Sequence, residues 1–308
     1  MRLVVLAPEA FAPLARLRSE AQDVEIIVGD EIGALREAAE SADAILATPH
    51  SASLLVDLWR DIRHVRWIHT LLAGVENLPY DLLRTSEVVV TNSRGLYADA
   101  LGEFAIAAML WFAKDLRRLA QNQSERRWEP FLVERLEGET AGIIGYGGIG
   151  QAVGRRAEAL GMRVVSVRKR GEMHDPTVDD VIREARYIVL STPLTPATYR
   201  LIDAKRIAAM RSDAVLINVS RGAVVDEAAL IDALRTRKIR GAALDVFETE
   251  PLPHESPLWT LDNILISPHS ADHTADAHDR AMDFFLENLR RFQRGEALEN
   301  VVDKVERY

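Results

Sequence analysis

Short apolar runs alternate with amphipathic stretches along the whole of this 308-residue chain. Aliphatic and β-branched runs bounded by polar residues predict strands, and apolar positions three and four residues apart predict helices. In the first third of the chain, strand-like runs occupy residues 3–6, 24–28, 44–47, 66–70 and 88–90, and a helical pattern covers 31–40. This alternation is typical of an open parallel sheet.

A second series follows a long helical pattern over residues 98–121 and a polar segment over 121–139. Its expected strands lie near 141–145, 163–167, 187–191, 214–218, 241–245 and 263–267, and a last helix covers 275–294. We therefore predict an α/β fold of two doubly wound parallel-sheet units, with a boundary near residue 97. Periodicity alone does not say which unit the last helix joins.

Composition narrows the classes of function. The apolar share of 48% and the charged share of 28% are those of a soluble globular protein. A formal charge of -9 argues against a nucleic-acid partner, and no apolar run is long enough to predict a membrane span. The chain has no cysteine, which excludes disulfides and thiolate metal sites and fits a cytoplasmic location. The eight histidines show no metal-ligand spacing, so no metal is expected.

A glycine-rich turn lies between an expected strand and an expected helix over residues 151–160. It has the spacing G-x-G-x-x-G, and its expected cofactor contacts are Gly145, Gly147, Gly148, Ile149 and Gly150. The first glycine permits a tight turn, the second lets backbone approach a pyrophosphate, and the third allows close helix packing. The helix N-terminus adds oriented N–H groups. We therefore predict a dinucleotide site here.

The next expected strand ends in three basic residues, Arg168, Lys169 and Arg170. An acidic residue at this point usually binds the free ribose 2′-hydroxyl of NAD. Arginine instead suits a 2′-phosphate, because its donors can bind the phosphate oxygens in pairs. We therefore expect NADP(H) in preference to NAD(H), although NAD(H) stays possible because basic loops are also common on solvated surfaces.

Three polar motifs follow expected strands of the second unit, and they supply Arg221, Glu250 and His269. The carboxyl ends of parallel strands share one edge of a sheet, so these loops should converge beside the glycine turn. Arginine suits a substrate carboxylate, histidine can donate a proton near neutral pH, and a neighbouring carboxylate stabilises the imidazolium. We predict that these three residues form the catalytic group of a 2-oxo acid reductase.

These motifs resemble the D-isomer-specific 2-hydroxyacid dehydrogenases, and most closely the glyoxylate and hydroxypyruvate reductases. The resemblance is carried by GIIGYGGIG at 142–150, PLTPAT at 193–198, NVSRGAVVD at 218–226, ALDVFETEP at 243–251 and SPH at 267–269. It runs across the chain with the motifs in family order. It implies hydride transfer between NAD(P)H and a small 2-oxo acid to give a D-2-hydroxy acid.

The resemblance also implies roles for further residues. Val219, Ser220, Asp245 and His269 would line the cofactor. The backbone of a substrate loop would bind the substrate carboxylate together with Arg221; this loop consists of Leu72, Ala73, Gly74 and Val75.

Family architecture implies a discontinuous, flavodoxin-like substrate domain over 1–97 and 275–308. It implies a Rossmann-type dinucleotide domain over 98–274, a substrate in the cleft between the domains, and a homodimer.

The sequence departs from the family pattern at two places. Arginine at 168 stands where many members have an acidic residue, and residues 270–273 replace a commoner glycine-rich run. Two alternatives stay open: a dinucleotide-sensing corepressor of the same fold, and a formate- or phosphoglycerate-type dehydrogenase with another substrate. His50 and His69 lie near strand ends as further candidate substrate contacts, and Trp259 is a candidate cover for the site.

Overall fold

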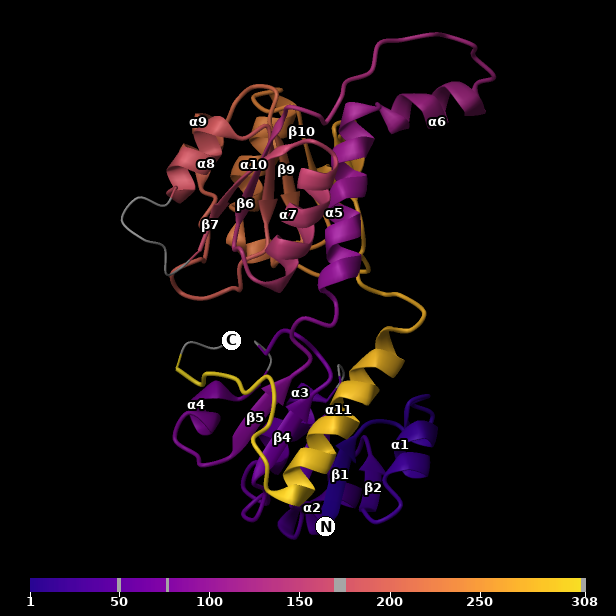
Figure 1. The fold of residues 1–308 in the computed structure, drawn as a ribbon, viewed down its shortest axis with the longest axis vertical. Coiled ribbons are helices and arrows are strands. Elements are labelled where there is room, and N and C mark those ends of the chain that lie inside the picture. The colour runs from indigo at the N-terminus through magenta and orange to yellow at the C-terminus, as the bar shows by residue number, and fades with distance from the viewer. Residues whose placement is uncertain (49–50, 76–77, 169–175, 306–308) are drawn as a thin grey trace. The chain divides into compact units, whose positions relative to one another are not determined.

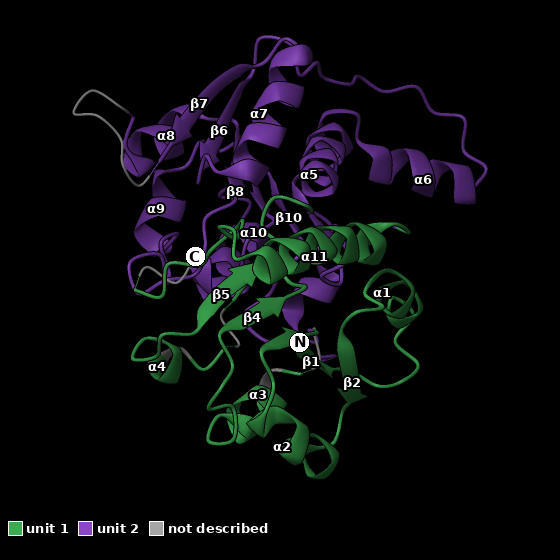
Figure 2. Cartoon of the chain, turned by 60° about the horizontal axis from the view of Figure 1, so that its bottom comes forward, with its two compact units in different colours: residues 1–96, 275–308 green, residues 97–274 purple. Residues whose placement is uncertain are grey.

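A computed structural model describes residues 1–48, 51–75, 78–168 and 176–305. The chain forms two compact units, and Figure 2 distinguishes them by colour. One contains residues 1–96 and 275–308, and the other contains 97–274. The first boundary expected from the sequence lies one residue later. Each unit is a parallel-sheet α/β body, as predicted.

The first unit is built on a five-stranded parallel sheet with the order β2-β1-β3-β4-β5. This is the flavodoxin-like order. The strands are β1 (Arg2–Leu6), β2 (Glu25–Gly29), β3 (Ala44–Ala47), β4 (Trp67–Thr70) and β5 (Val89–Asn92). The helices are α1 (Leu14–Glu20), α2 (Ile32–Glu40), α3 (Ala52–Leu58), α4 (Tyr80–Leu83) and α11 (Ala277–Arg294).

The last helix, α11, belongs to this first unit although some 180 residues separate it from β5. Its apolar face packs into the same core as β1 and α1. The ring of Phe285 stacks on buried Trp67 with 5.3 Å between centroids. This aromatic contact answers the question that periodicity left open, and it agrees with the family architecture.

The second unit contains a six-stranded parallel sheet with the order β11-β10-β9-β8-β6-β7. Its strands are β6 (Thr140–Ile144), β7 (Arg163–Val167), β8 (Tyr187–Leu190), β9 (Val215–Asn218), β10 (Gly241–Leu244) and β11 (Ile264–Ile266). Its α-helices are α5 (Ala98–Ala113), α6 (Leu116–Ser124), α7 (Gly148–Ala159), α8 (Val178–Glu184), α9 (Ala204–Ala209) and α10 (Glu227–Arg235). After β6 the chain adds β7 on one side of that strand and then β8 to β11 on the other side. Sheets of this kind bind ligands at the point between β6 and β8 where the strand order switches.

Two helix predictions are wrong in detail. The single helix expected over 98–121 is two helices, because Asp115 has a left-handed backbone (φ 46°) and its side chain caps α6. The helix expected to begin at residue 151 begins at Gly148. Glycine has a low intrinsic helix propensity, and that low propensity hid this first turn from the sequence pattern.

Helix α6 and the segment that follows it extend away from the sheet of the second unit (Figure 1). We call residues 116–135 the arm. Its large apolar side chains are unusually open to solvent: Trp128 is 97% exposed and Leu132 is 99% exposed. Such exposure is rare for these residue types unless a partner covers them.

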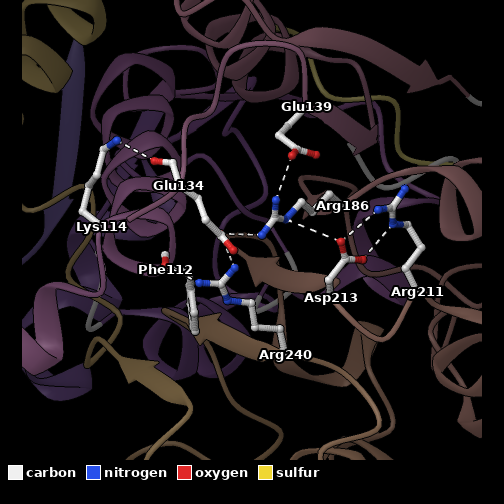
Figure 3. Close-up of polar contacts among 8 residues, drawn as sticks. All are labelled: Phe112, Lys114, Glu134, Glu139, Arg186, Arg211, Asp213 and Arg240. Carbon is white, nitrogen blue, oxygen red and sulfur yellow. Dashed lines mark hydrogen bonds and ion pairs between the residues drawn. The ribbon is translucent and has the colours of Figure 1, made fainter. Parts of the chain in front are cut away.

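An ion-pair network fixes the base of the arm to the amino-terminal edge of the sheet (Figure 3). At its centre is Arg186, whose side chain is only 9% exposed. Arg186 pairs with Glu134 of the arm and, at 2.8 Å, with Glu139. Arg240 also binds Glu134. Because Glu134 bridges residues that precede β8 and β10, the arm leaves the unit from a fixed point.

Candidate active site

The glycine turn joins β6 to α7 at the carboxyl edge of the second sheet. Gly145 has φ +100°, and a Cβ there would lie 2.7 Å from the backbone of Ser191. A Cβ on Gly150 would lie 2.4 Å from the carbonyl oxygen of Gly145. Around Gly147, which caps α7, a Cβ would meet nothing within 4 Å. Packing thus requires glycine at positions 145 and 150, whereas Gly147 faces open space.

This geometry fits the pyrophosphate of a dinucleotide. The open space at Gly147 lies at the N-terminus of a twelve-residue helix. The first N–H groups of a helix have no partner within it, and the helix dipole favours an anion. Gly148 and Ile149 contribute the first of these groups. The turn would therefore hold the phosphates through backbone donors, without needing a basic side chain.

Arg168 follows β7 and lies beside the glycine turn. Its guanidinium carbon is 5.0 Å from the centroid of the Tyr146 ring, a residue of the turn itself. The side chain is exposed, so its donors face solvent. Lys169 and Arg170, the other two residues expected to bind the cofactor, lie outside the described residues. The contact with Tyr146 was not foreseen, because the aromatic residue occupies a variable position of the glycine pattern.

The loop after β9 is shaped by a buried amide. Asn218 Oδ1 accepts hydrogen bonds from the N–H and Oγ of Ser220, at 3.0 and 2.8 Å. Its Nδ2 donates to the carbonyl oxygen of Arg221 at 3.0 Å. The Arg221 guanidinium is half-buried, and its Nη1 donates to the Ser220 carbonyl at 2.7 Å. Val219 and Ser220 are themselves buried, so the expected cofactor contacts there would have to come mainly from backbone.

The loop after β9 also packs tightly on the loop after β10. A Cβ on Gly222 would lie 1.8 Å from the carbonyl carbon of Phe247, so no side chain fits there. The strand ends are joined as well, since the Asp245 N–H donates to the Asn218 carbonyl at 3.1 Å. Backbone thus lies directly against backbone where the chain presents Arg221 on one loop and Glu250 on the other.

Glu250 and His269 come together as the sequence predicts. Nδ1 of His269 lies 2.7 Å from Oε2 of Glu250, and Oε1 of Glu250 accepts the Phe247 N–H at 2.9 Å. Both side chains are partly exposed, at 45% for the histidine and 35% for the glutamate. The carboxylate therefore fixes the ring orientation and leaves Nε2 as the nitrogen that can exchange a proton with a ligand.

Asp245 shapes the turn that carries the histidine. Its carboxylate is 2% exposed, and Oδ1 accepts hydrogen bonds from Ser267 Oγ (2.6 Å) and from the N–H groups of Ser270 (2.9 Å) and Ala271 (3.1 Å). His269 has a left-handed backbone (φ 52°), which costs free energy for a residue with a side chain. Three bonds to one buried oxygen offset that cost.

In the first unit, the substrate loop of Leu72, Ala73, Gly74 and Val75 follows β4 at the carboxyl edge of its sheet. The Leu72 carbonyl accepts the Ser93 N–H at 3.0 Å, and the Ala73 carbonyl accepts Asn92 Nδ2 at 2.7 Å. Within the described part of the chain, the N–H groups of Ala73 and Gly74 donate to no acceptor. Two free N–H donors in a held loop suit an anionic ligand.

The structure places two further residues considered in the sequence, His69 and Trp259. His69 is fully buried beside Phe284 and Phe285 and contacts Thr91, so its proposal as a substrate contact is wrong. A position near the end of a strand suggested that His69 reaches the substrate, but every residue of β4 is buried. Trp259 is half-exposed, and its Nε1 donates to the Pro253 carbonyl at 2.8 Å, which braces the loop after β10. His50 lies outside the described residues.

Two other kinds of feature are absent from the described residues. No cluster of three histidine, aspartate or glutamate side chains suited to a metal occurs among the residues with described coordinates. Over those same ranges, no helix has the length and apolar character needed to cross a bilayer.

Comparison with known proteins finds relatives of this chain. Residues 106–271 match the profile described as D-isomer specific 2-hydroxyacid dehydrogenase, NAD binding domain. The chain is 34% identical over 289 residues to the glyoxylate reductase of Thermococcus litoralis, an alignment covering 88% of this chain and 87% of that protein. It is 32% identical over 299 residues to the D-3-phosphoglycerate dehydrogenase of Methanocaldococcus jannaschii, covering 94% of this chain. The alignment spans only 57% of the latter protein.

A solved structure also shares the fold over nearly its whole length. It is a D-isomer specific 2-hydroxyacid dehydrogenase from Xanthobacter autotrophicus Py2, in complex with NADPH and MES. The identity is 28% and the TM-score 0.81, with 100% of this chain and 99% of that chain covered. The similarity therefore includes both units, and not the cofactor-binding motif alone.

Proposed function

This chain belongs to the D-isomer specific 2-hydroxyacid dehydrogenase family, and from that premise we propose that it reduces a small 2-oxo acid to the D-2-hydroxy acid with NADPH. Membership confirms the resemblance seen in the sequence and makes the chain an NAD(P)-dependent oxidoreductase. The observation that carries the proposal is the 2.7 Å contact between His269 and Glu250, at the sheet edge that also carries the glycine turn.

We assign the residues as follows. Residues 98–274 bind the cofactor, and residues 1–97 with 275–308 bind the substrate. Arg221 pairs with the substrate carboxylate, and the N–H groups of Ala73 and Gly74 donate to it. Bound NADPH supplies the hydride. His269 gives the proton on Nε2 to the carbonyl oxygen as it gains charge, and Glu250 stabilises the imidazolium before that transfer.

Replacement of His269 tests this assignment. His269→Ala is expected to fold normally and to lose at least about a hundredfold in kcat, the usual contribution of a general acid. His64→Ala is the matched control, because His64 is an exposed histidine of the other unit. Turnover should be measured with glyoxylate, hydroxypyruvate and phenylpyruvate. Near-wild-type turnover by His269→Ala would show that another group supplies the proton.

The preference for NADPH is a separate proposal that rests on Arg168. Its guanidinium is held over the Tyr146 ring while its donors face solvent, and no carboxylate stands at this position to repel a 2′-phosphate. The Xanthobacter relative was solved with NADPH, which agrees. Arg168→Asp should lower kcat/KM for NADPH by more than about tenfold and leave NADH use nearly unchanged. Arg183→Asp, an equal charge change at an exposed residue of α8, is the control.

Equal use of both cofactors by the wild type, unmoved by Arg168→Asp, would contradict the 2′-phosphate proposal while leaving the reaction class intact. We do not favour the corepressor alternative. The relatives named above are reductases and dehydrogenases, and the Glu250–His269 pair is in place. Absence of turnover with every 2-oxo acid tested, despite NADPH binding, would reopen it.

We also propose that the protein is a homodimer held by the arm. A second copy is the expected partner, because the exposed apolar groups sit on a segment that an ion-pair network holds out from its own unit. The double variant Trp128→Ser, Leu132→Ser should shift the mass measured by light scattering from dimer to monomer. A monomeric wild type, or a double variant that stays dimeric, would refute this.

A further inference from the structure

The substrate loop is held from behind by a chain of amide side chains that ends in the segment after α11. We call residues 296–305 the return segment. After α11 this segment runs back beside β5, where Thr91 and Val301 form an antiparallel bridge. The Val302 N–H donates to the Val90 carbonyl at 2.8 Å, and the Asn92 N–H donates to the Asn300 carbonyl at 3.3 Å. The return segment thus pairs with β5, at the edge of the sheet, over a single bridge.

Asn92 is bonded both to the return segment and to the substrate loop. It is the last residue of β5 and is 2% exposed. Its Nδ2 donates to the Ala73 carbonyl at 2.7 Å, and its Oδ1 accepts the Arg94 N–H at 3.3 Å. A buried amide with both ends bonded has one orientation. It therefore fixes the Ala73 peptide group, and with it the direction of the neighbouring Gly74 N–H.

Asn300 holds Asn92 in turn. Its Nδ2 donates to the carbonyl oxygens of Asn92 (3.2 Å) and Arg94 (2.8 Å). Its backbone is left-handed at φ 54°, a conformation that asparagine tolerates better than most residues. The return segment is itself anchored, because both polar atoms of buried Asn288 on α11 bond the backbone of Glu299, at 2.9 and 3.2 Å.

We propose that Asn92 is the positioning residue of the substrate loop, and that the return segment braces it through Asn300. The inference rests on the proposed role of Ala73 and Gly74 in binding the substrate carboxylate. An N–H donor that is misdirected by about 1 Å loses most of its value to a bound anion. Binding of the 2-oxo acid should therefore depend on two asparagines, Asn92 and Asn300, for which no direct contact with it is proposed.

Steady-state kinetics of three variants test the proposal. Asn92→Ala should raise the KM for glyoxylate roughly tenfold while the KM for NADPH stays within about twofold. Asn300→Gly should raise the glyoxylate KM by a smaller factor, about threefold, because glycine keeps the backbone conformation and removes only the side chain. Asn263→Ala is the control: this buried asparagine also donates to backbone carbonyls, but it lies in the other unit before β11.

Hydrogen exchange of peptides covering residues 71–75 gives a second readout that needs no turnover. Exchange there should quicken in Asn92→Ala and in Asn300→Gly, and stay unchanged in Asn263→Ala. Unchanged exchange, or an equal rise in both KM values, would overturn the proposal. If the wild type reduced no 2-oxo acid, the proposed function would fail, yet the exchange result would still decide whether Asn92 holds the loop.

Discussion

The fully buried His69 should make the first unit sensitive to mild acid. Burial among aromatic rings lowers its pKa from 6.5 to about 3, because the charged imidazolium cannot be solvated there. Nδ1 lies 2.7 Å from Thr91 Oγ1, and Nε2 is buried with no hydrogen-bond partner in the described structure. The folded unit therefore keeps this ring neutral above about pH 3.

The size of the effect follows from proton linkage. In the unfolded chain His69 takes up a proton near pH 6.5, whereas in the folded unit it does so only near pH 3. Stability is therefore full above pH 6.5 and falls as the pH drops toward 3. A pKa difference of this size lowers the free energy of unfolding by about 2 kcal/mol between pH 7 and 5, and by about 3 kcal/mol by pH 4.

The variant His69→Asn isolates this contribution, because it keeps a neutral polar group and removes the titration. Hydrogen exchange of the β4 amides, corrected for its intrinsic pH dependence, reports the free energy of opening this unit. The variant should be less stable at pH 7, since it leaves a cavity, but its stability should fall less steeply toward pH 5. Parallel curves for wild type and variant would refute the reasoning.

Two further changes test the architecture of the site. Gly222→Ala should destabilise the second unit by about 3 kcal/mol or more, because its Cβ would lie 1.8 Å from the Phe247 carbonyl carbon. Gly33→Ala, where a Cβ meets nothing within 4 Å, should be neutral or stabilising in the same thermal melt. Asp245→Asn should lower kcat about tenfold with little change in melting temperature, since a neutral oxygen binds the turn carrying His269 more weakly. An unaltered kcat in Asp245→Asn would show that the turn carrying His269 keeps its geometry without the Asp245 carboxylate.

The sequence could predict the architecture because both sheets bury continuous apolar strands. Periodicity located the strands, and the rule that parallel strands end at one edge brought Arg221, Glu250 and His269 toward one region. The periodic pattern predicted helix boundaries wrongly where local propensity and tertiary packing disagree. The break at Asp115 lies inside an uninterrupted helical pattern, and glycines hid the first turn of α7.

The supporting residues were harder to predict than the reacting ones. Asn218 begins the motif at residues 218–226, but its bonds to Ser220 and Arg221 depend on a turn geometry that spacing does not encode. Asn92 was missed because its partner Asn300 is 208 residues away. One signal was available in both cases: a polar residue closes an apolar strand directly before a functional loop.

The contact between Gly222 and Phe247 has a consequence for which parts of this protein can be changed separately. With backbone pressed on backbone, the loops of Arg221 and Glu250 cannot shift independently. A substitution that displaces one of these two loops therefore also displaces the other. The substrate loop belongs to the other compact unit, where the Asn92 amide supports it in addition to backbone hydrogen bonds. Under the proposed roles, the side chains of residues 71–75 can therefore be varied without disturbing the loops of Arg221 and Glu250, provided that Asn92 and Asn300 are kept.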